Sequence, residues 1–292
     1  MVTPPRVVAV GGGHGLSATL AAVRRYAGHV TAVVSVADDG GSSGRLRQAF
    51  AIPAPGDLRR CLVALGDPES AWAGYFEHRF DAGELEGHAL GNLVIAALTS
   101  ATGDFIAALD EAGRLVGCTG RVLPASTVPV VLKAQAACGS VEGQVNVSSA
   151  GSISSVSLVP PDAPAPEEAV AAIAAADQVV LGPGSLFTSV LAAALVPGIH
   201  AALADTSAVT TYVCNLRPQL PETDGFDVAA HVTALEVHGV RPDLVLCHPG
   251  ALATGNVACP VVIREVATGS GLVHDPALLG AALADLVAPG PR

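Results

Sequence analysis

The amino-acid sequence predicts an α/β fold: a Rossmann-like, doubly wound, mostly parallel sheet with helices on both faces and a small additional β region. A short β-branched segment at residues 6–10 ends in a glycine-rich turn that leads into a helix and then into a second buried strand at 30–37, which is the order of a βαβ unit. Half of the 292 residues are hydrophobic but only 3% are aromatic, so small aliphatic side chains must form the core. We expect one domain over 1–292, with the proline-rich connector 160–166 as its best internal boundary.

The charge balance argues against a nucleic-acid footprint. The formal net charge is -11, and Lys133 is the only lysine among 15 basic residues. No basic run alternates with aromatic residues, as extended nucleic-acid contacts require. The sequence shows no apolar run of membrane-spanning length and no layout of a signal peptide, so we expect a cytoplasmic protein without a membrane span.

The first glycine-rich turn follows the strand 6–10 and opens a helix expected over 16–26. It consists of Gly11, Gly12, Gly13, His14, Gly15, Leu16 and Ser17. A helix N-terminus after such a turn is suited to binding phosphate. The dinucleotide fingerprint is not met, because Leu16 stands where the third glycine belongs. His14 either contacts the phosphate or caps the helix.

A second polar stretch follows the buried strand 30–37. Its candidate ligand residues are Asp38, Asp39, Gly40, Gly41, Ser42, Ser43 and Arg45. Asp, Gly and Ser are also common in surface turns. We favour a ligand site, because the carboxyl end of a buried parallel strand lies at the crevice where such sheets bind ligands. The two carboxylates are suited to ribose hydroxyls, which the acidic residue at this strand end accepts in dinucleotide folds.

The next segments add candidates whose roles the sequence leaves open. Asp57 is placed to cap a helix that runs to Leu65, and Arg59 or Arg60 can face the acidic pair or a phosphate. Residues 71–80 carry aromatic side chains at helical spacing, which favours packing. His88 and Asn92 are four apart near an apolar helix, 93–98; they either satisfy each other or contact a base or sugar.

The rest of the chain alternates between helices and strands. The expected helices are 101–116, 167–176, 228–237 and 276–286, and the expected strands are 121–127, 130–133, 141–147, 153–158, 178–181, 210–216, 244–247 and 261–263. Another glycine turn, Gly182, Pro183, Gly184 and Ser185, follows the strand 178–181. Ser185 is either the N-cap of the next helix or part of a site that repeats the first turn's geometry.

These motifs together resemble one family, the gluconeogenesis factors (YvcK/GlmR proteins) of the CofD-like superfamily, in its actinobacterial branch. The stretches that match are 11–17, 36–47, 55–59, 87–93, 181–189, 214–216 and 221–226. The resemblance implies a Rossmann-like protein that binds UDP-sugars, notably UDP-N-acetylglucosamine, and that regulates cell-wall precursor supply and cell shape during gluconeogenic growth. It also implies a partner, which would be a cell-wall precursor enzyme. We expect the protein itself to form a homodimer.

The resemblance also suggests how the ligand is arranged. The diphosphate would lie on the 11–17 turn, and Asp38 or Asp39 would hold ribose, directly or through Mg²⁺. Gly184 and Ser185 would complete the anion shell, with Asn215, Thr223 and Asp224 near the sugar. The alternatives are a metal-dependent 2-phospho-L-lactate transferase or a sugar-nucleotide nucleotidyltransferase, as in the superfamily's other branch, and a scaffold that has lost its ligand. The chain departs from the family at Val273, where an arginine is usual.

Overall fold

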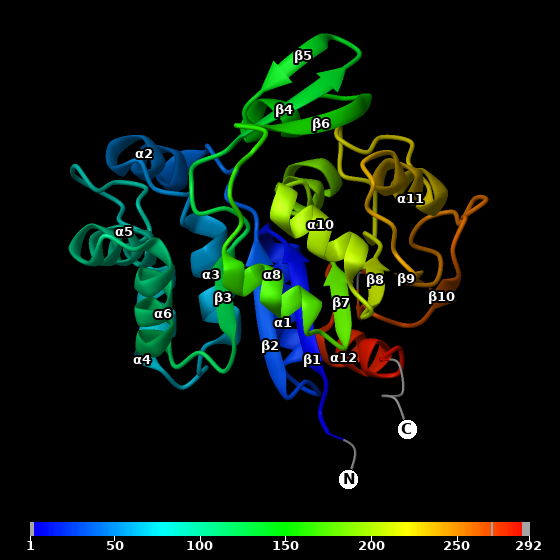
Figure 1. The fold of residues 1–292 in the computed structure, drawn as a ribbon, viewed down its shortest axis with the longest axis horizontal. Helices are drawn as coiled ribbons and strands as arrows, with labels where there is room; N and C mark the ends of the chain where they lie inside the picture. The colour runs from blue at the N-terminus through cyan, green and yellow to red at the C-terminus, as the bar shows by residue number, and fades with distance from the viewer. Residues whose placement is uncertain (1–2, 270, 288–292) are drawn as a thin grey trace.

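The computed structural model describes residues 3–269 and 271–287, which form a parallel sheet flanked by helices, with a small second sheet above it (Figure 1). The strands of the main sheet are β1 (Arg6–Gly11), β2 (His29–Val34), β3 (Arg121–Pro124), β7 (Gln178–Leu181), β8 (Val209–Val213), β9 (Leu244–Cys247) and β10 (Val261–Ile263). Their spatial order is β10-β9-β8-β7-β1-β2-β3, and every pairing is parallel. The Rossmann-like fold expected from the sequence is confirmed.

The order of the strands identifies where a ligand belongs. The chain starts at β1, winds outward through β2 to β3, and then returns to β7 on the other side of β1. The crossover direction therefore reverses between β1 and β7. In open parallel sheets, ligands bind outside the carboxyl ends of the strands at such a reversal.

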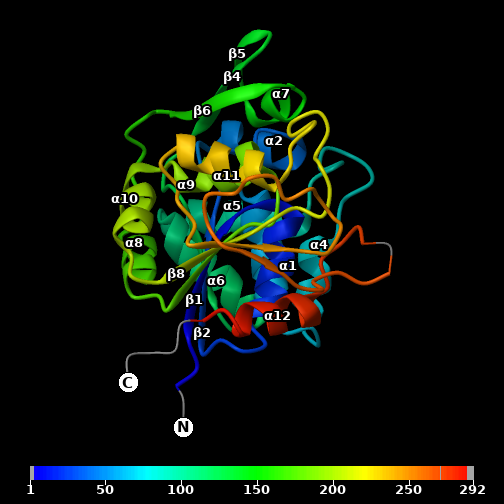
Figure 2. The ribbon, with the colours of Figure 1, turned by 90° about the vertical axis from the view of Figure 1, so that its right-hand side faces the viewer.

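Helices cover both faces of the main sheet (Figure 2). The helices are α1 (Gly13–Val23), α2 (Gly41–Phe50), α3 (Gly56–Leu65), α4 (Ala71–Glu77), α5 (Leu90–Thr102), α6 (Phe105–Val116), α7 (Gln144–Ser148), α8 (Glu167–Ala174), α9 (Ala192–Ala194), α10 (Pro197–Asp205), α11 (Val228–Val237) and α12 (Pro276–Ala284), with a π-helical segment η1 (Leu186–Leu191). Helices α1, α3 and α12 pack together on one face, and α8 and α10 on the other.

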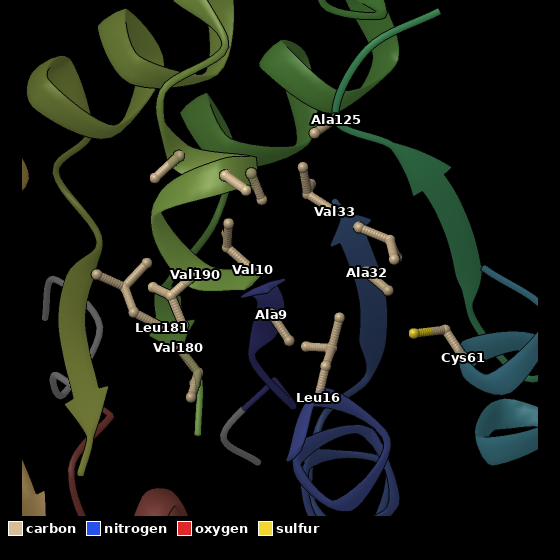
Figure 3. Close-up of a cluster of buried hydrophobic side chains, with 14 of the residues drawn as sticks. Ala9, Val10, Leu16, Ala32, Val33, Cys61, Ala125, Val180, Leu181 and Val190 are labelled. Carbon is tan, nitrogen blue, oxygen red and sulfur yellow. The ribbon is translucent and has the colours of Figure 1, made fainter. Parts of the chain in front are cut away.

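Small aliphatic side chains form the core between these layers. Val10, Val33 and Leu181 come from the adjacent strands β1, β2 and β7 and are fully buried, as is Leu16 of α1 (Figure 3). Small side chains let helices approach the sheet closely, and each buried methylene contributes about 0.8 kcal/mol. The low aromatic content of the sequence is therefore matched by the composition of the core.

The second sheet lies over the carboxyl edge of the main sheet (Figure 1). It is antiparallel, with the order β5-β4-β6, and its strands are β4 (Val131–Ala136), β5 (Gly139–Glu142) and β6 (Ile153–Val159). The sequence predicted this small β region but placed a strand over 141–147, where the structure has β5 ending at Glu142. The prediction of a strand beyond this point is wrong, because α7 occupies Gln144–Ser148.

Helix α2 is a further difference from the sequence expectation, which treated residues 40–45 as a loop. Glycine and serine are poor helix formers, so local propensity favours a loop there. Glycine is nevertheless required at one position: a Cβ on Gly44 would collide with the backbone of the nearby Asp39, so only glycine allows the chain to turn into α2 at this point. The strand before it is also shorter than predicted and ends at Val34.

Two other expectations are corrected by the structure. The helix predicted over 101–116 is the end of α5 and a separate α6, because Gly103 ends α5 in a left-handed conformation (φ 69°) and the Asp104 side chain caps α6. Of the aromatic residues of α4, Phe76 is buried as expected, but Trp72 and Tyr75 are exposed and contact each other edge to face.

Among the described residues, no single helix is long and apolar enough to cross a membrane. One bent pair, Leu186–Ala194 with Pro197–Asp205, meets the length and composition requirement only when the two segments are taken together. The residues 186–194 of this pair are buried against the main sheet.

Candidate functional site

A cavity of about 330 Å³ lies at the carboxyl ends of β1 and β2, beside the reversal of strand order. This volume is at the small end of the usual range for ligand sites. The cavity is lined by Gly13, Ser35, Asp38, Gly40, Gly41, Ser42, Ser43, Gly56, Asp57, Arg59, Arg60, Arg79, Asn92, Gln144, Thr188 and Ser189. Its lining therefore comes from the start of α1, the loop after β2, the helices α2, α3, α5 and α7, the segment after α4, and η1.

Two carboxylates face the cavity from adjacent elements. Asp38 follows β2, and one of its oxygens accepts a hydrogen bond from the Gly40 N–H at 3.0 Å. Asp57 lies in the first turn of α3 and accepts from the Gly13 N–H and the Arg60 guanidinium, both at 2.7 Å. Burial, assisted by the nearby charge of Asp38, raises the pKa of Asp57, and Arg60 opposes this shift. The mutual repulsion would be relieved by a cation.

The expected N-cap role of Asp57 is wrong. Helix α3 begins after Pro55, and no side chain caps it. The Asp57 carboxylate instead reaches across to the start of α1, where a Cβ on Gly12 would lie only 2.6 Å from its Oδ2 atom. The first glycine turn therefore already receives a carboxylate from the protein itself at the Gly13 N–H.

The N-terminus of α2 opens directly into the cavity. Gly40, Gly41, Ser42 and Ser43 all line it, and the helix starts with no side-chain cap. The N–H groups of a first helical turn are unpaired within the helix and favour an anion. Arg59, Arg60 and Arg79 line the same cavity and add positive charge. This arrangement suits a phosphate or diphosphate.

Ser42 is the centre of a buried polar network. Its hydroxyl lies 3.0 Å from His88 Nδ1 and accepts a hydrogen bond from Asn92 Nδ2 at 3.0 Å. His88 precedes α5 rather than sharing a helical face with Asn92, so the two residues meet through Ser42 and not through each other. Burial, with smaller contributions from Arg45 and Arg79, lowers the pKa of His88. The imidazole is therefore neutral at physiological pH.

The remaining residues of the first turn have mainly structural surroundings. His14 is exposed in the first turn of α1, and Leu16 is part of the core. Ser17 donates to the Gly13 carbonyl at 3.2 Å. A Cβ on Gly15 would collide with the Pro183 backbone, so glycine there allows the two glycine turns to pack against each other. Gly11 lies at the buried end of β1.

The loop of residues 182–189, which we call the clamped loop, is held from both sides by buried polar side chains. The Asn215 amide donates to the Gly184 carbonyl at 2.9 Å and accepts from the Gly184 N–H at 3.0 Å. Glu222 accepts from the Phe187 N–H at 2.8 Å and from the Ser185 hydroxyl at 2.6 Å. Gly182 and Pro183 are buried behind the cavity, and only Thr188 and Ser189 of the loop's described residues line it. Ser185 is at the N-cap position, but its side chain makes no capping bond.

Four further candidate residues, Asp39, Arg45, Thr223 and Asp224, are not among the described residues that line the cavity. Asp39 accepts from the Gln144 and Val145 N–H groups at 3.1 and 3.0 Å and so anchors α7 and the small sheet. Arg45 donates to the Glu86 carbonyl at 2.7 Å. Thr223 is buried and bonds to Gln219, and Asp224 is exposed in the same loop. At the point where the chain departs from the family, the Val273 side chain is 71% exposed.

Several residues of the site were not singled out by the sequence. They are Ser35, Gly56, Arg79, Gln144, Thr188, Ser189 and the loop-holding Glu222. Glu222 and Thr188 belong to the family-like stretches 221–226 and 181–189, so their positions in these motifs could have identified them as site residues. Arg79 and Gln144 gave no local signal, because long-range packing brings them to the cavity. No cluster of three or more metal-ligating side chains occurs within residues 3–269 and 271–287.

Comparisons with known proteins place this geometry in one family. Residues 7–259 match the family model described as 2-phospho-L-lactate transferase CofD. A Mycobacterium tuberculosis protein provisionally named a gluconeogenesis factor is 49% identical over 247 residues, covering 80% of this chain and 72% of that protein. The Bacillus subtilis gluconeogenesis factor is 43% identical over 237 residues, covering 80% and 75%.

A solved structure gives the same result for the fold. The crystal structure of a Bacillus halodurans protein, described as a member of the UPF0052 family, superposes with a TM-score of 0.91 at 36% sequence identity. The match covers 97% of this chain and 100% of that one. The chain belongs to the gluconeogenesis factor family of the CofD-like superfamily.

Proposed function

We propose that this chain is a cytoplasmic regulatory protein that binds a UDP-sugar, UDP-N-acetylglucosamine by its family resemblance, in the cavity at the start of α2. The observation that carries the proposal is the uncapped N-terminus of α2, which faces the cavity together with Arg60 and Arg79. Phosphate oxygens would accept from the backbone N–H groups and from the guanidinium groups. We assign the diphosphate to α2 rather than to α1, because Asp57 already accepts from the Gly13 N–H.

Asp38 and Asp57 fit a divalent cation that accompanies the diphosphate. Mg²⁺ is usually held by one or two carboxylates together with phosphate oxygens and water. Both side chains line the cavity, and the charge of Asp38 contributes to the raised pKa of Asp57. A bound cation would neutralise charge on the diphosphate. Asp38 would alternatively accept ribose hydroxyls directly, whereas the Asp39 oxygens are engaged by α7.

The regulatory part of the proposal rests on the family. Its named members are gluconeogenesis factors, which supports a role in carbon metabolism. We further propose a link to cell-wall precursor synthesis and cell shape, with a cell-wall precursor enzyme as partner and a homodimer as the working form. Pull-down from a lysate with and without UDP-N-acetylglucosamine tests the partner, and light scattering tests the dimer.

Calorimetric titration is the test of the binding site. We expect micromolar binding of UDP-N-acetylglucosamine and UDP-glucose, weak or no binding of NAD, and tighter binding when Mg²⁺ is present. Replacing Asp38 with alanine should abolish binding while the protein stays folded. Unchanged affinity in this variant would remove Asp38 from the site, and a wild-type protein that binds no nucleotide would refute the proposal.

A metal-dependent transferase is the second candidate, favoured by the match to the CofD model and by the paired carboxylates. Phosphoryl-type transfer needs positioning, positive charge and a metal more than it needs a covalent nucleophile. Product formation with Mg²⁺, either from a deazaflavin and an activated phospholactate donor or from UTP and a sugar phosphate, would establish this reading. Tight UDP-sugar binding without turnover would favour the regulator.

A further inference from the structure

We propose that Arg59 and Asn92 form a base-reading subsite that recognises the edge of uracil carrying the N3–H, or the equivalent N1–H edge of guanine. The inference rests on the proposed function, because it assumes that the ligand is a nucleotide. It adds that Arg59 and Asn92, on the inner wall of the cavity, contact the base of the nucleotide, and that they favour some bases over others.

Two polar atoms on this wall are buried and lack a partner among the described residues. Arg59 is 2% exposed and Asn92 is 3% exposed, and both side chains line the cavity. The unpaired atoms are Arg59 Nε, which is a donor, and Asn92 Oδ1, which is an acceptor. A buried polar atom without a hydrogen bond destabilises the protein, so a ligand that pairs with both atoms binds more tightly than one that pairs with neither.

The rest of each side chain is fixed, which aims the unpaired atoms. Arg59 Nη1 donates to the Phe76 carbonyl at 3.1 Å and lies 3.2 Å from the Glu77 carboxylate. The arginine stem passes beside Gly91, where a Cβ would come within 2.9 Å of Arg59 Cδ. Arg59 is therefore in contact with the residue next to Asn92.

The Ser42 network determines which end of the Asn92 amide faces the cavity. The Ser42 hydroxyl accepts from Asn92 Nδ2 and lies 3.0 Å from His88 Nδ1; in the Nδ1-acceptor tautomer of neutral His88, the hydroxyl would donate its proton to the ring and keep its lone pairs for Asn92. With Nδ2 used in this way, Asn92 presents its carbonyl oxygen to the ligand. Ser42 and His88 are thus positioning residues for Asn92.

A donor next to an acceptor matches a ring that carries N–H beside C=O. Uracil offers N3–H to Asn92 Oδ1 and a carbonyl oxygen to Arg59 Nε, and guanine offers N1–H and O6 in the same way. Cytosine and adenine have a lone pair at the central ring nitrogen, which would face the Asn92 oxygen. If the diphosphate on α2 fixes the register of the base, the mismatch cannot be relieved by sliding.

The test compares UDP, GDP, CDP and ADP by calorimetry with Mg²⁺ present. We expect UDP and GDP to bind roughly 10- to 100-fold more tightly than CDP and ADP. Asn92→Ala should lower UDP and GDP affinity to the CDP level and leave CDP and ADP unchanged. The matched control is Asn146→Ala, an exposed asparagine of α7 that bonds only to the Glu142 carbonyl in the described structure, and it should bind like wild type.

Other outcomes overturn the inference. Equal binding of all four nucleotides, or an Asn92→Ala variant that weakens all four equally, would show that the wall contacts phosphate or ribose. A loss confined to UDP-N-acetylglucosamine relative to UDP and UDP-glucose would assign Asn92 to the acetamido group. Wild-type protein that binds none of the four would overturn the proposed function and this inference together.

Arg59→Lys separates the two unpaired atoms. It keeps the positive charge but removes Nε, so UDP should lose affinity relative to CDP if Arg59 reads the base. An equal loss for both would assign Arg59 to phosphate and overturn its part of the subsite. Thermal unfolding of each variant confirms that the titrated protein is folded, and Asn92→Ala tests the proposal independently if Arg59→Lys does not fold.

Discussion

Helix α2 and the clamped loop 182–189 both place glycine and serine after a buried strand, yet their polar groups are used differently. At α2 the helix starts without a side-chain cap, and the neighbouring Arg59 and Asn92 have polar atoms left unpaired. In the clamped loop, Asn215 satisfies both backbone groups of Gly184, and Glu222 accepts from the loop's backbone and from Ser185. The first region leaves polar atoms without partners among the described residues, and in the second region the protein supplies the partners.

The difference shows how polar groups that could bind a ligand are distinguished from polar groups that stabilise the fold at the same edge of the sheet. Sequence motifs of the same composition bring residues to the same crevice in both cases. Whether a polar group binds a ligand depends on whether the protein already supplies its partner.

The largest effect is expected in the clamped loop. Glu222→Leu should lower the free energy of unfolding by about 3 kcal/mol, because the buried N–H of Phe187 and the Ser185 hydroxyl lose their acceptor. Urea denaturation measures this change in the free energy of unfolding. Glu142→Leu removes an exposed carboxylate that pairs with Lys133 and should change the free energy by no more than about 1 kcal/mol. Similar small losses in both variants would mean that the loop does not depend on Glu222.

In the cavity, a substitution should change ligand affinity strongly and stability only slightly. Asp38→Asn keeps an acceptor for the Gly40 N–H but removes the negative charge, so stability should change by less than about 1 kcal/mol. Affinity for UDP-sugars with Mg²⁺ should fall roughly tenfold or more, as calorimetry would show. The control is Asp224→Asn, an exposed residue outside the cavity lining of the described chain, which should bind normally. An equal loss in the control would extend the site to the 221–226 loop.

The same contrast explains how far the sequence could predict the molecule. Strand patterns and glycine turns were sufficient for the Rossmann-like sheet, because buried parallel strands are short runs of β-branched residues that end at one edge. Helix α2 was missed, because its glycines and serines have low helix propensity, and the need for glycine at position 44 beside the Asp39 backbone is visible only in the structure.

Within the site, the sequence identified residues but could not assign their partners. Asp38 and Asp39 are adjacent and alike in sequence, yet one lines the cavity and the other holds α7, more than a hundred residues along the chain. Asn215 and Asn92 are both buried at the sheet edge, but only Asn92 retains an unpaired oxygen. Such differences arise from contacts between distant segments, which spacing along the chain does not encode.

The third prediction concerns the small sheet above the cavity. Asp39→Ala removes the acceptor for the first N–H groups of α7, which should cost about 1 kcal/mol locally, as for the loss of a helix cap. Hydrogen exchange of the β4, β5 and β6 amides should accelerate several-fold, while the amides of β1 and β2 keep their protection. Asp162→Ala, in the exposed connector, should leave both sheets unchanged. Uniform acceleration in the Asp39 variant would show that the small sheet does not open separately.

The smallest effect is a difference in pH dependence. Burial raises the pKa of Glu222 above its ordinary value despite the hydrogen bonds from Ser185, Phe187 and Thr188. The folded protein therefore holds this proton more tightly than the unfolded chain, and the stability gained below pH 4.5 is lost as pH rises through the folded pKa. Each pH unit between the two pKa values costs about 1.4 kcal/mol.

Glu222→Gln removes this titration and leaves the others, including that of Asp57, which shifts in the same direction. Urea denaturation of both proteins from acidic to neutral pH measures the effect. Wild-type protein should lose stability relative to Glu222→Gln as the pH rises above the ordinary glutamate value. Parallel curves would mean that the unfolded and folded pKa values are equal, so that hydrogen bonds to the carboxylate fully offset its burial. A wild-type protein that gains relative stability with rising pH would mean that the hydrogen bonds to the ionised Glu222 carboxylate outweigh the cost of burying its charge.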